Sequence, residues 1–515
     1  MGIGAPGRAL LSVHDKTGLT ELGQSLSVLG WDLVASGGTA KALANSGLFV
    51  TAIERVTNHP EMLGGRVKTL HPAIHGGILA RDTEEDMRAL QEFGYAPISM
   101  VVCNLYPFRE TIAKEGATLE DAIEQIDIGG VTLIRAAAKN FSRVVVLCDP
   151  ADYASVIAKL RAGVEIDLEM RRKLAIKAFQ LTRDYDAAIY GYLAGETQPS
   201  AESLPEIFSL SVCKVEELRY GENPHQKGAL YAVPGDSKVL GGQVLGGKSL
   251  SYNNILDLDA AWRTVGLFDA PTVVIVKHLT PCGIASGPSL AQAFPQALVS
   301  DPVSAYGGVI AVNREIDQAF VNALGDLFIE AIAAPGFTNE AQKSLTEKRK
   351  NCRLLQMDAT VTESMVEYRS VRGGLLIQSL DKGDPAETQW KVVSKRQPTS
   401  EELEALHFVW KACQFVKSNA IVLGVKDATV GIGGGLPSRV DAARLAVEKA
   451  GERAKGAVMA SDAFFPFPDG AEVGIAAGIT AIVSPGGSIR DDQIIAAADA
   501  ANVALVFTGV RHFRH

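Results

Sequence analysis

Short apolar runs alternate with longer amphipathic runs along the first 195 residues. The apolar runs predict buried strands, at residues 9–13, 32–36, 99–105 and 143–149. Between the first two, residues 18–30 carry leucines at helical spacing, which predicts a helix. Strands that alternate with helices are typical of a parallel sheet covered by helices. The pattern therefore predicts an α/β domain at the start of the chain.

The polar sequence AGETQPSAESLPEIF, residues 194–208, breaks this alternation. It contains two prolines and has few apolar side chains to bury, which is typical of a connection between domains. Beyond it the rhythm resumes, and the apolar runs predict strands at 272–277, 308–312, 420–424, 457–460, 480–483 and 503–507. A charged, solvated helix is expected at 341–351, and a second boundary near 385–400. The predicted organisation is a first domain, a linker and two further parts, over residues 1–195, 196–206, 207–385 and 386–515.

Composition and charge narrow the class of protein. Of the 515 residues 47% are hydrophobic and 21% charged, which suffices for several buried cores. A net charge of −9 argues against binding nucleic acid through bulk charge. The six cysteines form no CxxC pair, so neither a zinc site nor a disulfide framework is expected. No apolar run reaches the roughly 18 residues of a membrane helix, and the N-terminus resembles no signal peptide. We expect a cytoplasmic protein without a membrane partner.

Polar side chains suited to a phosphate group follow the predicted strands of the first domain. Ligands of an open α/β sheet bind beyond the carboxyl ends of its strands. Hydroxyl groups, glycine amides and lysines near a helix N-terminus bind phosphate there. Such residues follow the first, second and third strands, and include Ser12, Lys16, Ser36, Thr39 and Asn104. Each alone is an ordinary cap or turn, but together they favour a phosphate ligand at one sheet edge.

The segment GGRVKTLHPAIHGGILARD, residues 64–82, is the densest in chemically active side chains. Between two Gly-Gly pairs it carries Arg66, Lys68, Thr69, His71 and His75. The glycines suggest a backbone shaped around a ligand. The two histidines, four residues apart, have the spacing of a zinc pair. The glutamate of an HExxH motif is missing, however, and Pro72 opposes a regular helix, so a metal site is weakly supported.

A second candidate site lies at VKHLTPCG, residues 276–283, where a buried strand ends at two basic side chains. On a continuous strand Lys277 and His278 would point to opposite faces of the sheet. Pro281 and Gly283 indicate that the strand stops, so that both side chains can face one pocket. The lysine charge would favour a neutral imidazole that can accept a proton. A lone histidine after a strand is more often structural, so the neighbouring lysine is what favours a catalytic pair.

These segments and others resemble one family closely. The motifs include SVHDKTGL, GRVKTLHPAIHGGILARD, NLYPF, IDIGG, LRYGENPHQ, KHLTPCG, VKSNAIVL, SDAFFPFPDG and RHFRH. From about residue 9 to its end, the chain resembles the bifunctional enzymes of purine biosynthesis in which AICAR (phosphoribosylaminoimidazolecarboxamide) formyltransferase is fused to IMP cyclohydrolase. The resemblance implies formyl transfer from 10-formyltetrahydrofolate to the 5-amino group of AICAR, giving FAICAR, and then dehydrative ring closure to IMP.

The resemblance also implies a fold and residue roles. The first domain would resemble methylglyoxal synthase, and the rest would consist of two cytidine-deaminase-like α/β halves without zinc. The implied cyclohydrolase centre comprises Lys68, Tyr106, Asp127 and Lys139. The implied nucleotide contacts of that domain are Ser12, Lys16, Ser36, Thr39, Arg66, Thr69, Asn104 and Gly129.

In the transferase, His278 would shuttle a proton, Lys277 would stabilise charge on the formyl oxygen, and Asn419 would orient the formyl group. The remaining implied contacts of that pocket are Arg219, Tyr220, Tyr306, Gly307, Glu330, Phe464, Arg511 and His515. The family further implies a homodimer with the transferase site at the subunit interface. No transition metal is implied, and a structural potassium ion is left open.

Four departures and two rival functions accompany the resemblance. GIGGGLPSR stands for the usual GIGAGQMSR, and SPGGS for QPGGS. Thr280 stands where the family usually has asparagine, and Tyr306 where it has phenylalanine, which puts substrate or folate affinity in question. The first domain could instead be a catalytically silent phosphate sensor, although the intact Lys68, Tyr106, Asp127 and Lys139 count against this. A zinc deaminase is disfavoured because Cys282 has no partner cysteine in a PCxxC motif.

Overall fold

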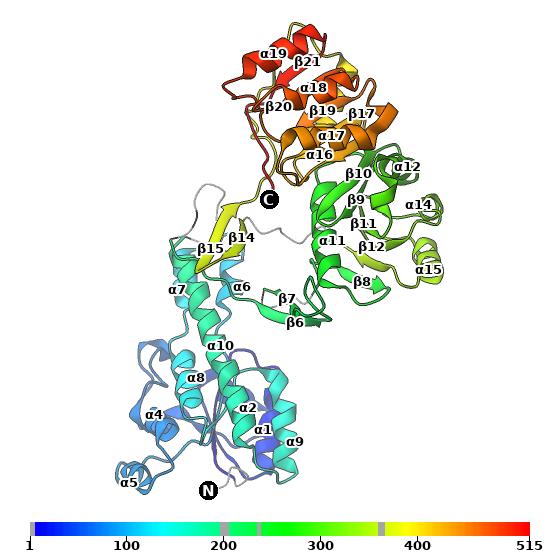
Figure 1. Cartoon of the computed structure of the whole chain (residues 1–515). Helices are drawn as coiled ribbons and strands as arrows, with labels where there is room; N and C mark the ends of the chain where they lie inside the picture. Colours follow the sequence, from blue (N-terminus) through cyan, green and yellow to red (C-terminus); the bar gives the residue numbers. More distant parts are fainter. Residues whose placement is uncertain (1–5, 196–203, 205, 234–237, 359–365) are drawn as a thin grey trace. The chain divides into compact units, whose positions relative to one another are not determined.

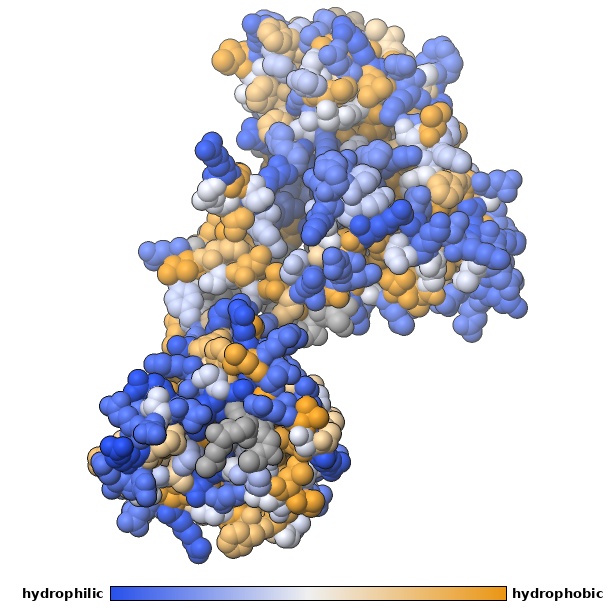
Figure 2. All heavy atoms as spheres, turned by 60° about the horizontal axis from the view of Figure 1, so that its bottom comes forward, coloured by the Kyte–Doolittle hydropathy of each residue, from blue (hydrophilic) through white to orange (hydrophobic). Residues whose placement is uncertain are grey.

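A computed structural model describes residues 6–195, 204, 206–233, 238–358 and 366–515 (Figure 1). The chain forms two compact units, Met1–Ser209 and Leu210–His515. Most of the expected linker, residues 196–206, lies outside the described residues. Figure 2 shows polar side chains over both units on the face in view, with apolar side chains scattered among them. In the part of the chain that the structure describes, no helix is long and apolar enough to cross a membrane.

The first unit contains a parallel sheet, as the sequence pattern predicted. Among its described residues the sheet has five strands in the order β3-β2-β1-β4-β5. The strands are β1 (Arg8–Ser12), β2 (Asp32–Ala35), β3 (Thr51–Ala52), β4 (Met100–Cys103) and β5 (Val145–Leu147). The longer helices are α1 (Leu19–Val28), α2 (Gly37–Asn45), α4 (Pro72–Leu79), α5 (Glu84–Glu92), α8 (Gly129–Lys139), α9 (Tyr153–Arg161) and α10 (Leu168–Leu193). Shorter helices are α3 (Ile53–Thr57), α6 (Phe108–Ile112) and α7 (Leu119–Glu124).

The strand order fixes where a ligand can bind in the first unit. Strand β1 pairs in parallel with β2 on one side and with β4 on the other. The order along the chain therefore reverses between β1 and β4, and ligands of such sheets bind at that switch point. The middle residues of β1 are fully buried, because helices cover both faces of the sheet. The carboxyl ends of β1 and β4 are consequently the place to look for a site.

One local expectation about the first unit is wrong. Pro72 does not oppose a helix, because it occupies the first position of α4. A proline is tolerated there, since the first amide of a helix has no partner within the helix. The Nδ1 atom of His71 caps the same helix by accepting from the Ala73 amide at 3.1 Å. This first histidine of the supposed zinc pair therefore has a capping role.

The second unit is built on one long mixed sheet. Its described strands run in the order β16-β21-β20-β19-β17-β18-β10-β9-β11-β12-β13-β8. One group comprises β8 (Gln243–Gly246), β9 (Thr272–Lys277), β10 (Thr280–Ser286), β11 (Gly308–Val312), β12 (Ile329–Ala334) and β13 (Arg353–Gln356). The other comprises β16 (Lys391–Val392), β17 (Ile421–Val425), β18 (Ala428–Gly433), β19 (Val458–Ser461), β20 (Ala481–Ser484) and β21 (Ala504–Phe507). Two hairpins, β6 (Cys213–Leu218) with β7 (Gly228–Ala232) and β14 (Val366–Val371) with β15 (Gly374–Ser379), lie outside this sheet.

The two groups of strands repeat one topology. Each begins with an edge strand, continues with an antiparallel hairpin and ends with three parallel strands. The hairpins β9–β10 and β17–β18 meet at the centre, where Ala285 of β10 pairs with Ala428 of β18. The predicted strands are confirmed to within a residue or two, but the antiparallel hairpins were not apparent from the spacing of the apolar runs. The exact boundary at residue 385 stays a prediction.

Helices cover both faces of this sheet (Figure 1). They are α11 (Tyr252–Val265), α12 (Leu290–Ser300), α13 (Pro302–Ala305), α14 (Gln318–Ala323), α15 (Asn339–Lys348), α16 (Ser400–Cys413), α17 (Arg439–Ala450), α18 (Asp469–Ala476) and α19 (Asp491–Ala500). The charged helix expected at 341–351 is α15, which begins after a Thr338 cap that accepts from the Ala341 amide at 3.3 Å. A single apolar core contains Val274 and Ile284 of the first hairpin and Val422 and Ile432 of the second. The two halves thus share a core, which fixes the geometry between them.

Candidate functional site

The first candidate site lies at the carboxyl ends of β1 and β2. The hydroxyl groups of Ser12 and Ser36 lie 2.8 Å apart, and Ser36 occupies the N-cap position of α2. Thr39 Oγ1 accepts from the Val13 amide at 3.0 Å, which ties α2 to the loop after β1. The Lys68 ammonium group lies close to Gly37 at the start of α2, because a methyl group built on the Gly37 Cα would be only 2.7 Å from Lys68 Nζ. A lysine ammonium group therefore stands at the positive end of a helix, an arrangement that favours an anionic ligand.

An acidic side chain and a phenol adjoin this anion site. Asp127 Oδ1 accepts from the Gly130 amide at 2.7 Å, and the Tyr106 backbone amide also donates to this carboxylate. Burial raises the pKa of Asp127 above its ordinary value, against the effect of those hydrogen bonds. Burial, with the nearby Asp127 charge, raises the pKa of Tyr106 as well. The site therefore holds a carboxyl group shifted toward neutrality beside a phenol that stays protonated.

Contacts join these groups into one cluster. The Thr69 hydroxyl lies close to Gly129, because a methyl group built on the Gly129 Cα would be only 2.7 Å from Thr69 Oγ1. The segment that carries Lys68 and Thr69 therefore reaches the start of α8. The rings of His14 and Tyr106 meet edge to face at 5.6 Å. Asn104 is committed to the loop after β1, because its Oδ1 accepts from the His14 amide at 2.6 Å. The implied role of Asn104 as a substrate contact stays a prediction.

Three other basic residues are implied for the first site, and their surroundings differ. Lys139 is the last residue of α8, whereas Gly129 is the first. Since a helix rises 1.5 Å per residue, about 15 Å separates these two ends. Lys139 is exposed at the far end, so the structure does not bring it together with Asp127. Arg66 is ion-paired with Glu124, and Lys16 Nζ donates to the His14 carbonyl at 3.2 Å.

The second candidate site begins at the turn between β9 and β10. His278 and Leu279 form that turn with φ values of 53° and 64°, as a two-residue hairpin of type I′ requires. The Asp257 carboxylate holds it by accepting from the Leu279 amide at 2.6 Å and the His278 amide at 3.3 Å. The strand does end at Lys277, but Pro281 and Gly283 are not the cause, because both lie within β10.

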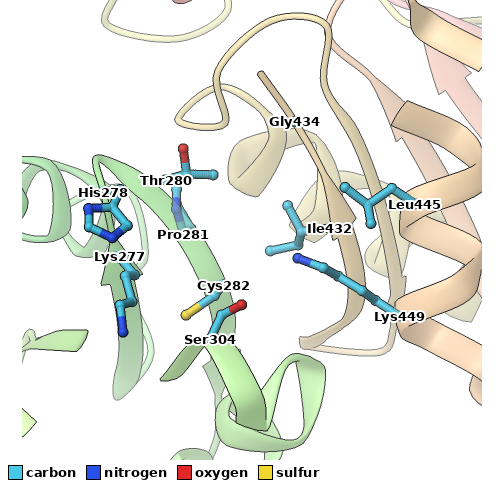
Figure 3. A pocket seen from close by; sticks show the side chains of 10 residues that line it. All are labelled: Lys277, His278, Thr280, Pro281, Cys282, Ser304, Ile432, Gly434, Leu445 and Lys449. Atoms are coloured by element: carbon cyan, nitrogen blue, oxygen red, sulfur yellow. The ribbon is translucent and has the colours of Figure 1, made fainter. Parts of the chain in front are cut away.

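The turn places both basic side chains on one cavity of about 340 Å³. Figure 3 shows Lys277 and His278 on the hairpin side, and Leu445 and Lys449 of α17 on the other side. Lys277 Nζ donates to the Tyr306 carbonyl, and Lys449 is ion-paired with Asp301 at 2.7 Å. Thr280, one of the departures from the family pattern, also lines this cavity. The full lining is Lys277, His278, Thr280, Pro281, Cys282, Ser304, Ile432, Gly434, Leu445 and Lys449.

Cys282 in the wall of this cavity is not a candidate nucleophile. Burial raises the pKa of its thiol to about 12. A thiol rather than a thiolate is therefore present at neutral pH, and the thiol is a poor nucleophile. The other ionisable side chains of this lining are Lys277, His278 and Lys449.

Other implied transferase residues line a second cavity, of about 520 Å³. Asn419, Phe464 and Arg511 contribute to its wall. Asn419 Oδ1 accepts from Arg439 Nη2 at 2.8 Å, and its Nδ2 donates to the Leu436 carbonyl at 2.9 Å. Among the described residues none lines both cavities. The structure thus divides the implied transferase residues between two places.

The remaining implied contacts lie around the first half and at the chain end. Gly307 adjoins Lys277, and the ring of Tyr306 lies 5.4 Å from that of Phe328. Glu330 of β12 is ion-paired with Arg353. Arg219 follows β6 and stacks on Tyr220 at 5.5 Å. The His515 carbonyl accepts from Arg369 Nη2 at 2.7 Å.

Sequence reasoning missed a buried ion pair at the second cavity, in which Arg439 contributes to the cavity wall. Arg439 and Asp462 are bonded to each other, and neither is more than 7% exposed. Asp462 also accepts from the Ser418 hydroxyl, so the pair anchors the peptide that carries Asn419. The signal was present, since Arg439 ends the glycine-rich segment GIGGGLPSR and Asp462 follows a buried strand. Only the fold shows that these two residues, 23 positions apart, face each other.

Comparison with known proteins identifies the family. The family model "AICARFT/IMPCHase bienzyme" matches residues 137–449, more than half of the chain, and an "MGS-like domain" model matches residues 18–132. The chain is 49% identical over 521 residues to "Bifunctional purine biosynthesis protein PurH" of Sorangium cellulosum (strain So ce56), covering 99% of both proteins. The chain belongs to the AICARFT/IMPCHase bienzyme family. The solved "Crystal structure of ForH" is 37% identical over 37% of this chain and 98% of its own, with a TM-score of 0.35.

Family membership confirms the main expectations from the sequence. The first unit has the predicted methylglyoxal-synthase-like fold, and the chain as a whole is α/β. As a bienzyme of this family, the protein is both a formyltransferase and an IMP cyclohydrolase, catalysing the last two steps of IMP synthesis. A formyl folate is accordingly its cosubstrate. Within the described residues no group of three or more His, Cys, Asp or Glu side chains is arranged to hold a metal ion.

Proposed function

We propose that the first unit closes the ring of FAICAR, and that the second unit transfers the formyl group of 10-formyltetrahydrofolate to AICAR through Lys277 and His278. The observation that carries the proposal is the hairpin turn at His278 and Leu279, which brings both basic side chains to one cavity. An absorbance assay that follows AICAR and 10-formyltetrahydrofolate to IMP tests it. Failure of the purified protein to form IMP would overturn the proposal.

In formyl transfer, the 5-amino nitrogen of AICAR attacks the formyl carbon. A C–N bond forms, the bond from the formyl carbon to folate N10 breaks, and N10 takes up a proton. His278 removes the proton that the amine loses, and the Lys277 ammonium stabilises the negative charge on the formyl oxygen. The amine is a weak nucleophile, because its lone pair is delocalised into the imidazole and carboxamide. Proton removal and charge stabilisation are therefore the steps that the protein has to assist.

In ring closure, the carboxamide nitrogen attacks the new formyl carbon, and water then leaves. Lys68 at the N-terminus of α2 stabilises negative charge there, and Asp127 and Tyr106 exchange protons with the reacting groups. The hydroxyl groups of Ser12, Ser36 and Thr39 lie at the same sheet edge for the nucleotide phosphate. Lys139 has no part in this mechanism, because it lies at the other end of α8.

The division of the transferase residues over two cavities supports a homodimer. Lys277 and His278 line one cavity, whereas Asn419, Phe464 and Arg511 line the other. We infer that the first cavity of one protomer and the second cavity of its partner complete one transferase site at the subunit interface. A cytoplasmic location also belongs to this proposal, and a structural potassium ion stays a prediction.

A fragment that ends at Pro199 should fold and close FAICAR without formylating AICAR. The reason is that the first unit has its own sheet and core, including α10, which packs on α8 and β5. Circular dichroism and the conversion of FAICAR to IMP check this expectation. A folded fragment without cyclisation would contradict the assignment of the site, whereas an insoluble one would contradict the domain boundary.

Replacing Arg511 by alanine should weaken AICAR binding to the intact protein. Arg511 lies on the wall of the second cavity, and an arginine there suits the nucleotide phosphate. A charge-assisted hydrogen bond contributes about 1.5–3 kcal/mol, and a loss of this size is measurable by calorimetric titration. Arg372→Ala, in the exposed β14–β15 turn, is the matched control. Unchanged AICAR affinity in Arg511→Ala would remove Arg511 from the nucleotide site.

A further inference from the structure

The last residues of the chain alternate between two environments. Arg511 and Phe513 are exposed and line the second cavity. His512, between them, is only 3% exposed, and Arg514 is half-buried with its guanidinium 4.6 Å from the Phe415 ring. Side chains of an extended segment point alternately to opposite sides. One side of this tail therefore faces the cavity while the other is anchored in the protein.

The anchor on the buried side is a histidine between two carboxylates. His512 Nδ1 lies 2.7 Å from Asp381 Oδ2, and Nε2 lies 2.9 Å from Asp384 Oδ1. Carboxylate oxygens only accept hydrogen bonds, so both ring nitrogens must donate. A neutral imidazole has one N–H group, and the ring is therefore an imidazolium. Two indole N–H groups, of Trp410 at 3.0 Å and Trp390 at 3.2 Å, hold Asp384 in place.

Charged groups on several segments surround His512. The segment after β15 supplies Asp381 and Asp384, whereas α16 presents Trp410, whose ring lies 5.2 Å away and does not titrate. His407 of α16 and Arg514 of the tail also interact electrostatically, with Asp384 and Asp381 respectively. Burial disfavours the charged ring, but the hydrogen bonds that the ring donates to the two carboxylates outweigh burial and raise the pKa of His512 to about 9. The imidazolium is thus the form present at neutral pH.

The anchored side of the tail is also bonded to the peptide that carries Asn419. The His512 amide donates to the Asp462 carbonyl at 3.0 Å, and the Ser418 amide donates to the Arg514 carbonyl at 2.8 Å. The Asp462 carboxylate binds Arg439, which in turn donates to Asn419 Oδ1 at 2.8 Å. One hydrogen-bonded network therefore connects both parts of the cavity wall, that is, the part formed by Arg511 and Phe513 and the part formed by Asn419.

We propose that His512 is a positioning residue of the formyltransferase, which holds Arg511 and Phe513 against the second cavity through its clamp between Asp381 and Asp384. The proposal rests on the transferase function proposed above. His512 itself does not line the cavity wall that the described residues form, so it acts through its two neighbours. Loss of the clamp should raise the KM for AICAR and leave kcat at saturating AICAR largely unchanged.

The clamp also predicts a pH dependence with a definite sign. The pKa of His512 in the folded protein, about 9, is above its ordinary value of 6.5. The stabilisation from the clamp is therefore complete below about pH 6.5 and is lost as pH rises through about 9. In the wild-type protein the KM for AICAR should consequently rise as pH passes about 9.

The test compares His512→Gln with the wild-type protein and with Glu404→Gln. Glutamine has both of its N–H groups on one nitrogen and its oxygen only accepts, so it cannot replace donors at both ring positions, and the clamp is broken without a large change in volume. Glu404 is an exposed residue of α16 and lines neither cavity among the described residues, which makes Glu404→Gln a control. Asp381→Asn weakens the clamp less and should preserve the fold, because the Asp381 side chain is 44% exposed.

In His512→Gln we expect the KM for AICAR to rise about tenfold or more, as for a lost charge-assisted contact. Asp381→Asn should raise this KM to a smaller extent. The rise in KM above pH 9 should disappear in His512→Gln, and closure of added FAICAR should be unchanged in all variants.

An unchanged KM in both clamp variants, or a loss of kcat at constant KM, would overturn the proposal. If His512→Gln does not fold, Asp381→Asn decides by the same criteria. Wild-type protein that forms no FAICAR would contradict the proposed function instead, so the two failures are distinguishable.

Discussion

His278→Ala should lose formyl transfer by about 10²–10⁴-fold, the usual contribution of a general base. The turn at residues 278–279 presents this imidazole to the same cavity as Lys277, and no second histidine lines that cavity within the described residues. The weak amine of AICAR cannot attack efficiently without loss of its proton. The measurement is the rate of FAICAR formation from AICAR and 10-formyltetrahydrofolate at saturating substrate concentrations.

The bifunctional chain supplies the control for this experiment. Closure of added FAICAR by His278→Ala should proceed at the wild-type rate, because that site lies in the other unit. His407→Ala, which alters a histidine of the same unit outside both cavities, should keep formyl transfer. Near-normal transfer by His278→Ala would show that another group accepts the proton.

Lys68→Ala should have the opposite defect and accumulate FAICAR. Its ammonium group lies at the N-terminus of α2, beside the hydroxyl groups of Ser12 and Ser36. Removing this charge takes away the stabilisation that we propose for the negative charge of ring closure, and we expect about a 10²–10³-fold slower cyclisation. Chromatography of a reaction started with AICAR would show FAICAR in place of IMP.

Lys173→Ala is the matched control for this variant. Lys173 lies on the exposed side of α10, where it is paired with Glu169 at 2.7 Å. This variant should accumulate no FAICAR. Normal cyclisation by Lys68→Ala would instead favour the view of the first unit as a silent phosphate sensor.

The apolar runs were sufficient to predict where the strands end, and hence where a site could form. Buried strands such as β9 and β11 are continuous apolar runs, because helices cover both faces of the sheet, so their limits are apparent in the sequence. The hydroxyl cluster at Ser12 and Ser36 followed from the same reasoning. Strand direction was not predictable, since the β9–β10 turn uses His278 and Leu279 rather than the Asn-Gly or Asp-Gly pairs that mark such turns.

Long-range pairing accounts for what the sequence did not show. Arg439 and Asp462 each stand at a recognisable place in the chain, but nothing in the sequence indicates that they pair. The partners of His512 lie 128 and 131 residues before it. Lys139 shows the same dependence on packing, because its motif implies a place in the first site, whereas α8 carries it to the end opposite Gly129. Sequence motifs identify the chemistry, but which side chains share a cavity depends on how distant segments pack.

The most direct test of the bifunctional assignment follows one carbon atom through both reactions. The purified full-length protein is incubated with AICAR and 10-formyltetrahydrofolate that carries ¹³C in its formyl group, and the product is examined by NMR. We predict that the label appears in IMP at the ring carbon between the former amine nitrogen and the former carboxamide nitrogen, with FAICAR as a transient intermediate. IMP without the label, or labelled FAICAR that never closes, would contradict the account.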